Sequence, residues 1–170
     1  GDLAKAAEIR YGRIPETEKE LAEASARLDQ VHEGSRLLQE EVTFIPGFVD
    51  FHHSVKNLYR MAVGTSLDRT LFHLVEKKIP LSKLFGTHVY SIGDIGYISK
   101  PNPDIFLYSA KNLEVDPENC VVIEDAPNGI EAAKRAGMKC IALTTSLSRE
   151  KLLRADIIVN SYSEIDLSRF

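Results

Sequence analysis

The sequence has few cysteines and no long hydrophobic run, and both features narrow the classes of protein to which it can belong. Its two cysteines, Cys120 and Cys140, begin two apolar runs and lack CxxC spacing, which argues against a disulfide framework or a zinc site. We therefore expect two buried thiols in a reducing cytosol. No apolar run approaches the roughly 20 residues of a membrane-spanning helix, and no signal-peptide pattern opens the sequence, so we expect a cytoplasmic protein without a membrane partner.

An excess of positive charge is also lacking. The formal net charge is -4 and lysine and arginine are scattered along the sequence. Such a distribution gives no attraction to a phosphate backbone, so a nucleic-acid partner is not expected. A hydrophobic share of 44% in 170 residues is enough for the core of one ordinary globular domain with a small appendage.

Two segments differ in their residue pattern. Residues 2–41 are rich in alanine, glutamate and leucine, with apolar residues at helical spacing and a break at Pro15, which predicts two helices. From Pro46 onward, short β-rich runs alternate with amphipathic helices, the pattern of a parallel sheet built from βαβ units. We therefore predict an α/β protein with a helical segment over residues 1–42 and an α/β core over residues 43–170.

The apolar periodicity predicts five strands and five helices in the core. The strands are expected at residues 61–64, 88–92, 120–123, 140–143 and 157–159. The helices are expected at residues 47–59, 68–77, 103–113, 127–136 and 148–154. For the third helix, Asn102 is expected to be the N-cap and Pro103 the first helical residue.

Two adjacent carboxylates, Glu124 and Asp125, follow the apolar run that begins at Val121. Ligands of open α/β folds bind at the carboxyl ends of parallel strands. A pair of charges at the end of a buried strand is costly unless a cation or hydrogen bonds satisfy it, and carboxylate oxygens suit Mg²⁺. We therefore predict that both residues are metal ligands. The alternative is that Asp125 caps the helix that follows.

Polar residues at other expected strand ends are candidates for binding phosphate. Thr65 and Ser66 follow one strand and precede a helix, an arrangement typical of a phosphate cradle but also of a helix N-cap. Two prolines, Pro101 and Pro103, follow Lys100 and fix the direction of its side chain. Its ammonium group could therefore neutralise a phosphoryl group, although a solvated lysine fits the same pattern. Gly129 is expected to allow a tight turn, where Asn128 could contact a ligand.

The remaining titratable residues give weaker signals. Asp94 follows an expected strand, so it either hydrogen-bonds near the site or caps a turn. His52 and His53 are neighbours in a predicted helix and cannot share one face. Since the histidines show no metal-ligand spacing, we interpret them as ordinary residues.

Three segments, taken in chain order, resemble the second, third and fourth motifs of the haloacid dehalogenase superfamily. They are Ala62-Val-Gly-Thr-Ser66, Ser99-Lys-Pro-Asn-Pro-Asp-Ile-Phe106 and Val122-Ile-Glu-Asp-Ala-Pro-Asn-Gly-Ile-Glu-Ala-Ala133. Within the superfamily, the sequence is most similar to the β-phosphoglucomutase-like phosphatases. The resemblance implies a Rossmannoid parallel sheet, with residues 1–42 as part of a helical cap.

The resemblance also implies an activity and a role for each candidate residue. The reaction would be Mg²⁺-dependent transfer of a phosphoryl group from a small phosphorylated metabolite, of the sugar-phosphate or nucleoside-phosphate class, through an aspartyl phosphate. Thr65 and Ser66 would hold the phosphoryl oxygens, and Lys100 would offset their charge. Asp125 and Glu124 would hold Mg²⁺ directly or through water.

One element of the family pattern is missing. The superfamily begins with a strand that ends in Asp-x-Asp-Gly-Thr and supplies the nucleophile and the general acid/base, and no such segment occurs here. Asp50 leads into a helix rather than ending a strand, so it cannot easily replace them, and Asp68 and Asp94 are no better placed. In the family this strand lies between the strands that end here at Thr65 and Glu124. Its absence predicts two unpaired strand edges.

Several functions fit these motifs. The first is an N-terminally truncated phosphatase that is inactive by itself. The others are a noncatalytic module that binds phosphate and Mg²⁺, a phosphomutase similar to β-phosphoglucomutase, and a receiver-type signalling domain. Receiver domains place their acids first, whereas Glu124 and Asp125 come after Thr65 and Lys100, so the order argues against the last of these.

Overall fold

The computed structural model describes residues 42–170, together with Ser25, Asp29 and His32, which are helical. The chain divides into two units, Gly1–Glu41 and Val42–Phe170, and the second contains the α/β fold. The helical cap expected over residues 1–42 lies almost entirely outside the described residues and stays a prediction.

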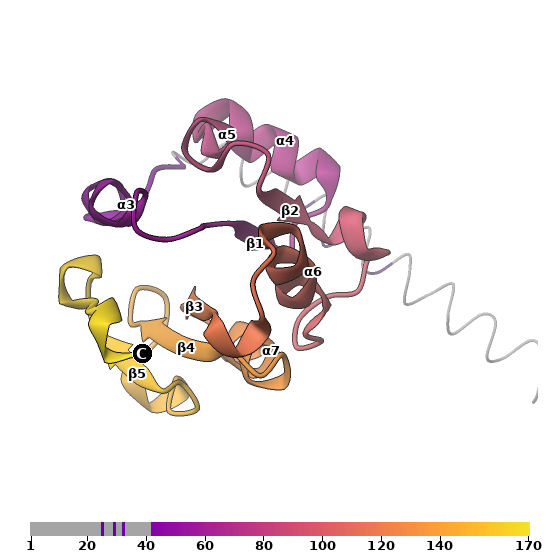
Figure 1. The fold of residues 1–170 in the computed structure, drawn as a ribbon. Helices are drawn as coiled ribbons and strands as arrows, with labels where there is room; N and C mark the ends of the chain where they lie inside the picture. Colours follow the sequence, from indigo (N-terminus) through magenta and orange to yellow (C-terminus); the bar gives the residue numbers. More distant parts are fainter. Residues whose placement is uncertain (1–24, 26–28, 30–31, 33–41) are drawn as a thin grey trace, which may run out of the picture. The chain divides into compact units, whose positions relative to one another are not determined.

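Five short strands form two separate parallel sheets (Figure 1). In the first, β1 (Val63–Thr65) pairs with β2 (Val89–Ser91). In the second, the order is β3 (Val121–Glu124), β4 (Lys139–Leu143) and β5 (Ile157–Val159). All five strands lie where the apolar runs predict them, and every pair is parallel, so the α/β prediction is confirmed. Within residues 42–170, no strand joins β1 to β3.

Four of the five expected helices are present. They are α3 (Phe48–Val55), α4 (Arg69–Lys78), α6 (Asp104–Leu113) and α7 (Pro127–Arg135). The sequence pattern missed α5 (Leu81–Phe85), which is too short to show a periodicity. Short 3₁₀ turns complete the chain at η2 (Ile92–Ile95), η3 (Pro117–Asn119), η4 (Arg149–Lys151), η5 (Tyr162–Glu164) and η6 (Leu167–Arg169).

The helix expected at residues 148–154 is wrong. Only the 3₁₀ turn η4 forms there: the backbone leaves the helical conformation at Leu152 (φ −112°, ψ 9°), whose side chain is fully buried in the core. The expected cap of α6 is also wrong: Pro103 is the N-cap, and the side-chain amide of Asn102 instead donates to the carbonyl of Ser99 at 3.1 Å. Asn102 thus orders the preceding loop rather than the helix.

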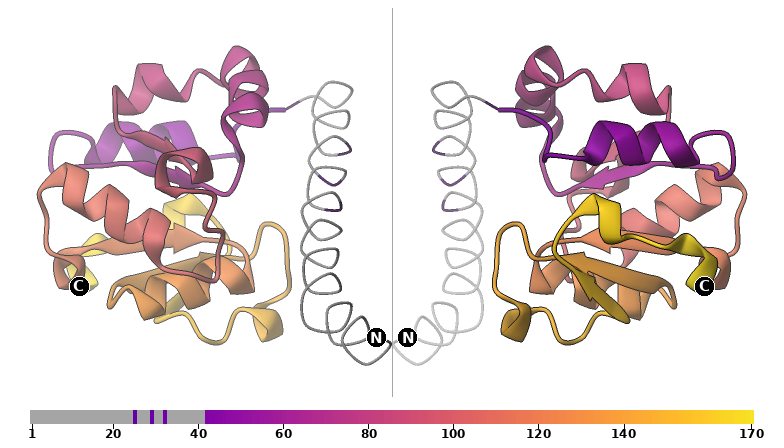
Figure 2. Two further views of the ribbon diagram at one scale, coloured as in Figure 1. Left: turned by 90° about the vertical axis from the view of Figure 1, so that its right-hand side faces the viewer. Right: turned by 90° about the vertical axis from the view of Figure 1, so that its left-hand side faces the viewer.

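The helices α6 and α7 pack on one side of the strands, and α3 lies with the C-terminal turns on the other (Figure 2). Alanines of α7, among them Ala132 and Ala133, are fully buried, so this helix can approach β3 and β4 closely. Cys140 is fully buried in the same core, as predicted. Cys120 is only partly buried, because it lies just before β3 begins, and the prediction of a buried thiol is wrong there.

The carboxylate of Asp156 links α7 to β4. It accepts from the ammonium group of Lys134 at 2.8 Å and from the backbone N–H of Cys140 at 2.7 Å. Burial raises the pKa of Asp156, but the hydrogen bonds from Lys134 and Cys140 outweigh burial and lower it overall. A lowered pKa in the folded state stabilises the protein above the unfolded-state pKa, and this stabilisation is lost as the pH falls through the folded-state value.

Asp156→Asn is therefore expected to destabilise the fold by about 1 kcal/mol at neutral pH, with the difference from wild type shrinking below the ordinary pKa of aspartate. Urea unfolding of wild type and variant at pH 7 and at pH 3 measures the difference in their free energy of unfolding at each pH. The exposed Glu118 provides a control, since Glu118→Gln should change neither. An equal loss for Asp156→Asn at both pH values would contradict the lowered pKa.

Candidate functional site

An ion pair between two largely buried side chains joins two of the sequence motifs. The ammonium group of Lys100 contacts Oε1 of Glu124, and the two side chains are only 14% and 11% exposed. The same nitrogen lies 4.7 Å from the ring centroid of Phe106, a cation–π contact. Oε2 of Glu124 accepts from the backbone N–H of Asp125 at 3.2 Å. The loop at Lys100 is thereby fixed against the carboxyl end of β3.

Gly129 makes room for this ion pair. A Cβ atom at this position would lie 2.1 Å from Cδ of Glu124, so any larger residue would occupy the space of the carboxylate. Gly129 lies inside α7 and is not among the residues with positive φ. The expected tight turn is therefore wrong, and the position needs glycine because of the close approach of Glu124.

Asp125 faces the loop that follows β4. Its Oδ2 accepts from the hydroxyl of Ser146 and, at 3.5 Å, from that of Thr145. The N-cap of α7 is Ala126, without a side-chain hydrogen bond, so the alternative role of Asp125 as a helix cap is wrong. The sequence analysis missed Ser146 and Thr145, although they follow an apolar strand at the same sheet edge.

Thr65 ends β1, and its Oγ1 accepts from the backbone N–H of Leu67 at 3.1 Å. The cap of the following helix is Asp68, which accepts from the N–H of Leu71 at 2.7 Å. Neither Thr65 nor Ser66 is therefore the N-cap of α4. As an acceptor in this bond, the Thr65 hydroxyl keeps its proton to donate elsewhere, and Ser66 is exposed.

Asp94 has a structural role. Its Oδ2 accepts from the N–H of Ser91 at 2.8 Å, which is part of a capping box at η2. Its Oδ1 accepts from Arg69 at 2.6 Å. Burial raises the pKa of Asp94, but the hydrogen bonds from Ser91 and Arg69 outweigh it and lower the pKa. His52 is buried and bonds to the carbonyl of Leu84 at 3.2 Å. Asn128 is exposed at the start of α7.

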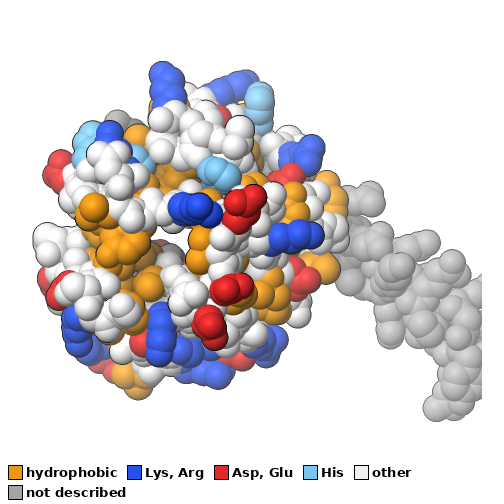
Figure 3. All heavy atoms as spheres, in the orientation of Figure 1, with side chains coloured by type: hydrophobic (Ala, Val, Ile, Leu, Met, Phe, Trp, Pro, Cys, Tyr) orange, Lys and Arg blue, Asp and Glu red, His pale blue; other side chains and the backbone are white. Residues whose placement is uncertain are grey.

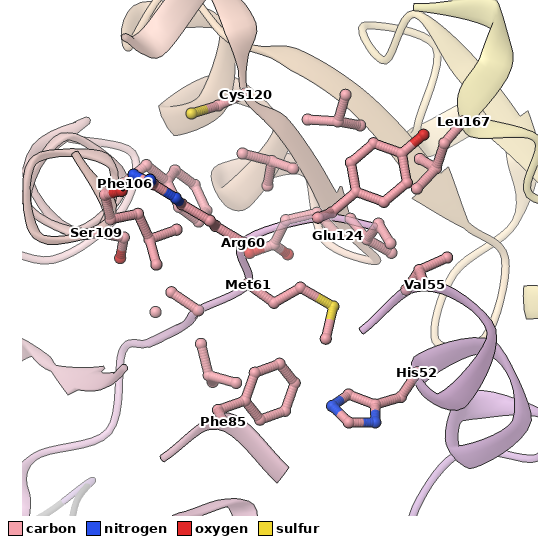
Figure 4. Close-up of a pocket in the computed structure, with 18 of the residues that line it drawn as sticks. His52, Val55, Arg60, Met61, Phe85, Phe106, Ser109, Cys120, Glu124 and Leu167 are labelled. Carbon is pink, nitrogen blue, oxygen red and sulfur yellow. Dashed lines mark hydrogen bonds between the residues drawn. The ribbon is translucent and has the colours of Figure 1, made fainter. Parts of the chain in front are cut away.

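A cavity of about 840 Å³ separates the two sheets. Val63 and Gly64 of β1 and all four residues of β3 line it, and it extends to Phe85 and Phe106. Figure 3 shows hydrophobic side chains around this hollow. In Figure 4, the side chain of Met61 extends into its middle, between Glu124 on one side and Phe85 and His52 on the other. The cavity lies where the sequence predicts two unpaired strand edges.

The model of a protein family described as haloacid dehalogenase-like hydrolase matches residues 3–137. The chain belongs to this family. Relatives of the haloacid dehalogenase-like chain include the protein CbbY of Cereibacter sphaeroides, 31% identical over 76% of this chain and 57% of CbbY. Another is the β-phosphoglucomutase of Bacillus subtilis, 43% identical over 40% of this chain and 29% of that enzyme. These relatives place the chain in the phosphoglucomutase-like branch.

A solved structure of the same branch shares the fold. A mutant of CbbY from Rhodobacter sphaeroides, in complex with xylulose-(1,5)bisphosphate, superposes with a TM-score of 0.68 at 28% identity, over 84% of this chain and 65% of that one. The haloacid dehalogenase-like chain thus has the family's Rossmannoid fold. It spans little more than half the length of CbbY and less of the β-phosphoglucomutase.

The residues at the end of β3 fit the Mg²⁺ that the family resemblance implies. Glu124 and Asp125 are consecutive residues at the end of β3 and both carry carboxylate oxygens, and Mg²⁺ usually takes one or two protein carboxylates and completes its shell with water and phosphate. Across the described part of the chain, no group of three or more histidine, cysteine, aspartate or glutamate residues could hold a metal. No described helix is long and apolar enough to cross a membrane.

Proposed function

We propose that Thr65, Lys100, Glu124 and Asp125 form the phosphate-binding and Mg²⁺-binding half of a phosphoryl-transfer site for a small phosphorylated metabolite. The buried pair of Lys100 and Glu124, directly before Asp125, is the observation that carries the proposal. Removing a lysine from water to pair it with a carboxylate costs free energy. Binding a phosphate group would give this lysine a function, because its charge would neutralise the phosphate. Relatives named for phosphorylated sugars support the sugar-phosphate or nucleoside-phosphate class.

Each residue has a distinct task in this proposal. The hydroxyl of Thr65 and the backbone amide of Ser66 would donate to the nonbridging oxygens, while Lys100 would move from Glu124 toward the phosphoryl group. Asp125, oriented by Ser146, would hold Mg²⁺, with Glu124 acting directly or through water. The bound Mg²⁺ would supply charge neutralisation to the phosphoryl oxygens. These steps bind and orient a phosphate group in the way that phosphoryl transfer requires.

Attack and proton transfer need acids that this sequence does not contain. The family takes both from an Asp-x-Asp segment, which is absent here. We therefore infer that this chain by itself binds phosphate and Mg²⁺ without turnover, as a noncatalytic module would. A hydrolase and a phosphomutase would share this half of the site, so the proposal covers phosphoryl transfer in general.

Calorimetry with inorganic phosphate and MgCl₂ on the purified chain tests the proposal. Wild type is expected to bind phosphate more tightly when Mg²⁺ is present. Asp125→Asn should remove this dependence on Mg²⁺. Thr65→Val should weaken phosphate binding about fivefold, which corresponds to the loss of one hydrogen bond of about 1 kcal/mol, and phosphate binding should still depend on Mg²⁺. The exposed Asp116 provides the control, because Asp116→Asn should bind like wild type. Wild type without detectable phosphate binding would remove the proposal.

A further inference from the structure

The loop that carries Thr65 and the loop that leads to Lys100 begin at neighbouring strand ends. Thr65 is the last residue of β1 and pairs in register with Ser91, the last residue of β2. Neighbouring strands lie about 4.8 Å apart, so the two loops leave the same sheet edge side by side. The first loop enters α4 at Arg69, and the second forms η2 and then continues to Lys100. A contact between these loops therefore fixes one phosphate-binding segment relative to the other.

An ion pair joins the two loops. The guanidinium group of Arg69, the first residue of α4, donates to Oδ1 of Asp94 at 2.6 Å. Beside this pair, the N–H of Ile92 donates to the carbonyl of Leu67 at 3.3 Å. A Cβ atom at Gly93 would lie 3.1 Å from Cγ of Arg69, so the stem of the arginine packs closely on η2. The two loops are thus joined at three points.

Asp94 is itself held in place by its own loop. Its Oδ2 accepts from the N–H of Ser91 at 2.8 Å and from the hydroxyl of the same residue at 3.0 Å. After η2, the N–H of Tyr97 donates to the carbonyl of Ile92 at 2.8 Å, and Tyr97 adopts a left-handed conformation with φ 63° as the chain turns toward Lys100. Aromatic residues rarely adopt this conformation, so the contacts around η2 determine the path of the loop.

The ion pair of Arg69 and Asp94 should have more effect on geometry than on stability. The side chain of Arg69 is 71% exposed, and exposed ion pairs contribute little to stability because water screens them. A loop that is already held in its binding conformation, however, loses less conformational freedom when a ligand binds. Hydrogen bonds also weaken steeply when their geometry is distorted. A weak ion pair can therefore have a large effect on ligand binding.

We propose that Arg69 and Asp94 are positioning residues of the phosphate site. Their ion pair holds the loop of Thr65 and Ser66 against η2, so that the phosphate donors of this loop keep a fixed place relative to the loop of Lys100. The pair acts through these loops and does not itself contact the phosphate group. Neither residue belongs to the three segments that resemble the family motifs. The inference rests on the proposed function, because it concerns the phosphate-binding half of the same site.

A double variant that keeps the net charge separates positioning from charge. Arg69→Met/Asp94→Asn removes one positive and one negative charge together, so the electrostatic attraction of the site for an anion changes little. Calorimetry of the full chain with inorganic phosphate and MgCl₂ measures the affinity. We expect phosphate affinity to fall at least about fivefold, which corresponds to the loss of one well-placed hydrogen bond.

Asp156→Asn provides the matched control. Like Asp94, Asp156 accepts from a cation, Lys134, and from a backbone N–H, that of Cys140. Cys140 lies near the amino end of β4, however, and the site lies at the carboxyl ends of the strands. Asp156→Asn should therefore lose stability in urea unfolding and still bind phosphate like wild type.

Amide hydrogen exchange measures the position of the loop without phosphate. The N–H of Leu67 donates to Oγ1 of Thr65 at 3.1 Å, so its exchange rate reports whether the loop keeps its conformation. The double variant Arg69→Met/Asp94→Asn should exchange this amide at least about fivefold faster than wild type, by the same loss of one hydrogen bond. The amides of β4 should exchange at the wild-type rate.

Three results would overturn this inference alone. The first is a double variant that binds phosphate as wild type does. The second is weaker phosphate binding with unchanged exchange at Leu67, which would mean that the pair contacts the phosphate directly. The third is an equal loss of phosphate affinity in Asp156→Asn, which would mean that general destabilisation is the cause. Wild type without detectable phosphate binding would instead remove the proposed function, and this inference with it.

Discussion

Replacing Gly129 with alanine is expected to weaken the binding of Mg²⁺ and phosphate at least about tenfold while leaving the fold intact. The new Cβ would lie 2.1 Å from Cδ of Glu124 and 2.3 Å from each of its carboxylate oxygens, so the carboxylate must move. Its ion pair with Lys100 would then shift from its present position. Alanine in a helix gains about 1 kcal/mol over glycine, whereas overpacking costs about 1 to 3 kcal/mol. The net loss of stability should therefore be at most about 2 kcal/mol.

The measurement pairs thermal unfolding with calorimetric titration of phosphate and Mg²⁺. Phosphate affinity should fall at least about tenfold, since both the lysine and the metal-binding carboxylate lose their positions. A second variant provides the control: shortening the acid in Gly129→Ala/Glu124→Asp should recover stability relative to Gly129→Ala alone. If Gly129→Ala binds phosphate as wild type does, the position of Glu124 is not important for the site.

Replacing Lys100 with methionine is expected to produce the largest loss of stability. Removing one partner of a buried ion pair leaves the other charge buried without a counterion, which costs about 3 to 5 kcal/mol. The side chain of Glu124 is only 11% exposed, so water can solvate little of its unpaired charge. Methionine keeps most of the packing against Phe106, and the change therefore isolates the charge. Phosphate binding should fall with it, because the cation that neutralises the phosphoryl group is gone.

An ion pair with an exposed cation provides the comparison. Arg69 pairs with Asp94 but is 71% exposed, so Arg69→Met should cost about 0.2 to 1 kcal/mol. The double variant Lys100→Met/Glu124→Gln should recover part of the lost stability, because no buried charge is left unpaired, yet it should not recover phosphate binding. Urea unfolding compares all variants. If Lys100→Met lost no more stability than Arg69→Met, the ion pair of Lys100 and Glu124 would be effectively solvated.

The strands could be predicted because each is an apolar run bounded by polar residues. Glu124 and Asp125 could also be predicted as site residues, since two acids directly after such a run seldom have a purely structural role. The prediction was wrong for the segment around Leu152, where the backbone leaves the helical conformation after a single 3₁₀ turn. Apolar periodicity alone does not reveal such a break.

Contacts between distant residues could not be predicted. Ser146 meets Asp125 across 21 residues, and Gly129 is required by a carboxylate that approaches from another element. Both depend on how the loops fold over the sheet edge, which no local pattern contains. The absent Asp-x-Asp strand, by contrast, did predict where the sheet would be interrupted, because the family motifs fix the order of the strands.

The interrupted sheet also affects how the molecule can deform. In an ordinary α/β sheet, separating neighbouring strands breaks a ladder of backbone hydrogen bonds. Between β1 and β3, the described residues form no such ladder, so widening the cavity strains only side-chain contacts. The close packing of Gly64 on Ile105, where an added Cβ would lie 2.9 Å from Cγ1 of Ile105, fixes α6 to the first sheet. Within the described residues, the two sheets are therefore joined by the side chains of one buried core, which includes Tyr90 of β2 and Val122 of β3, rather than by a ladder between β1 and β3.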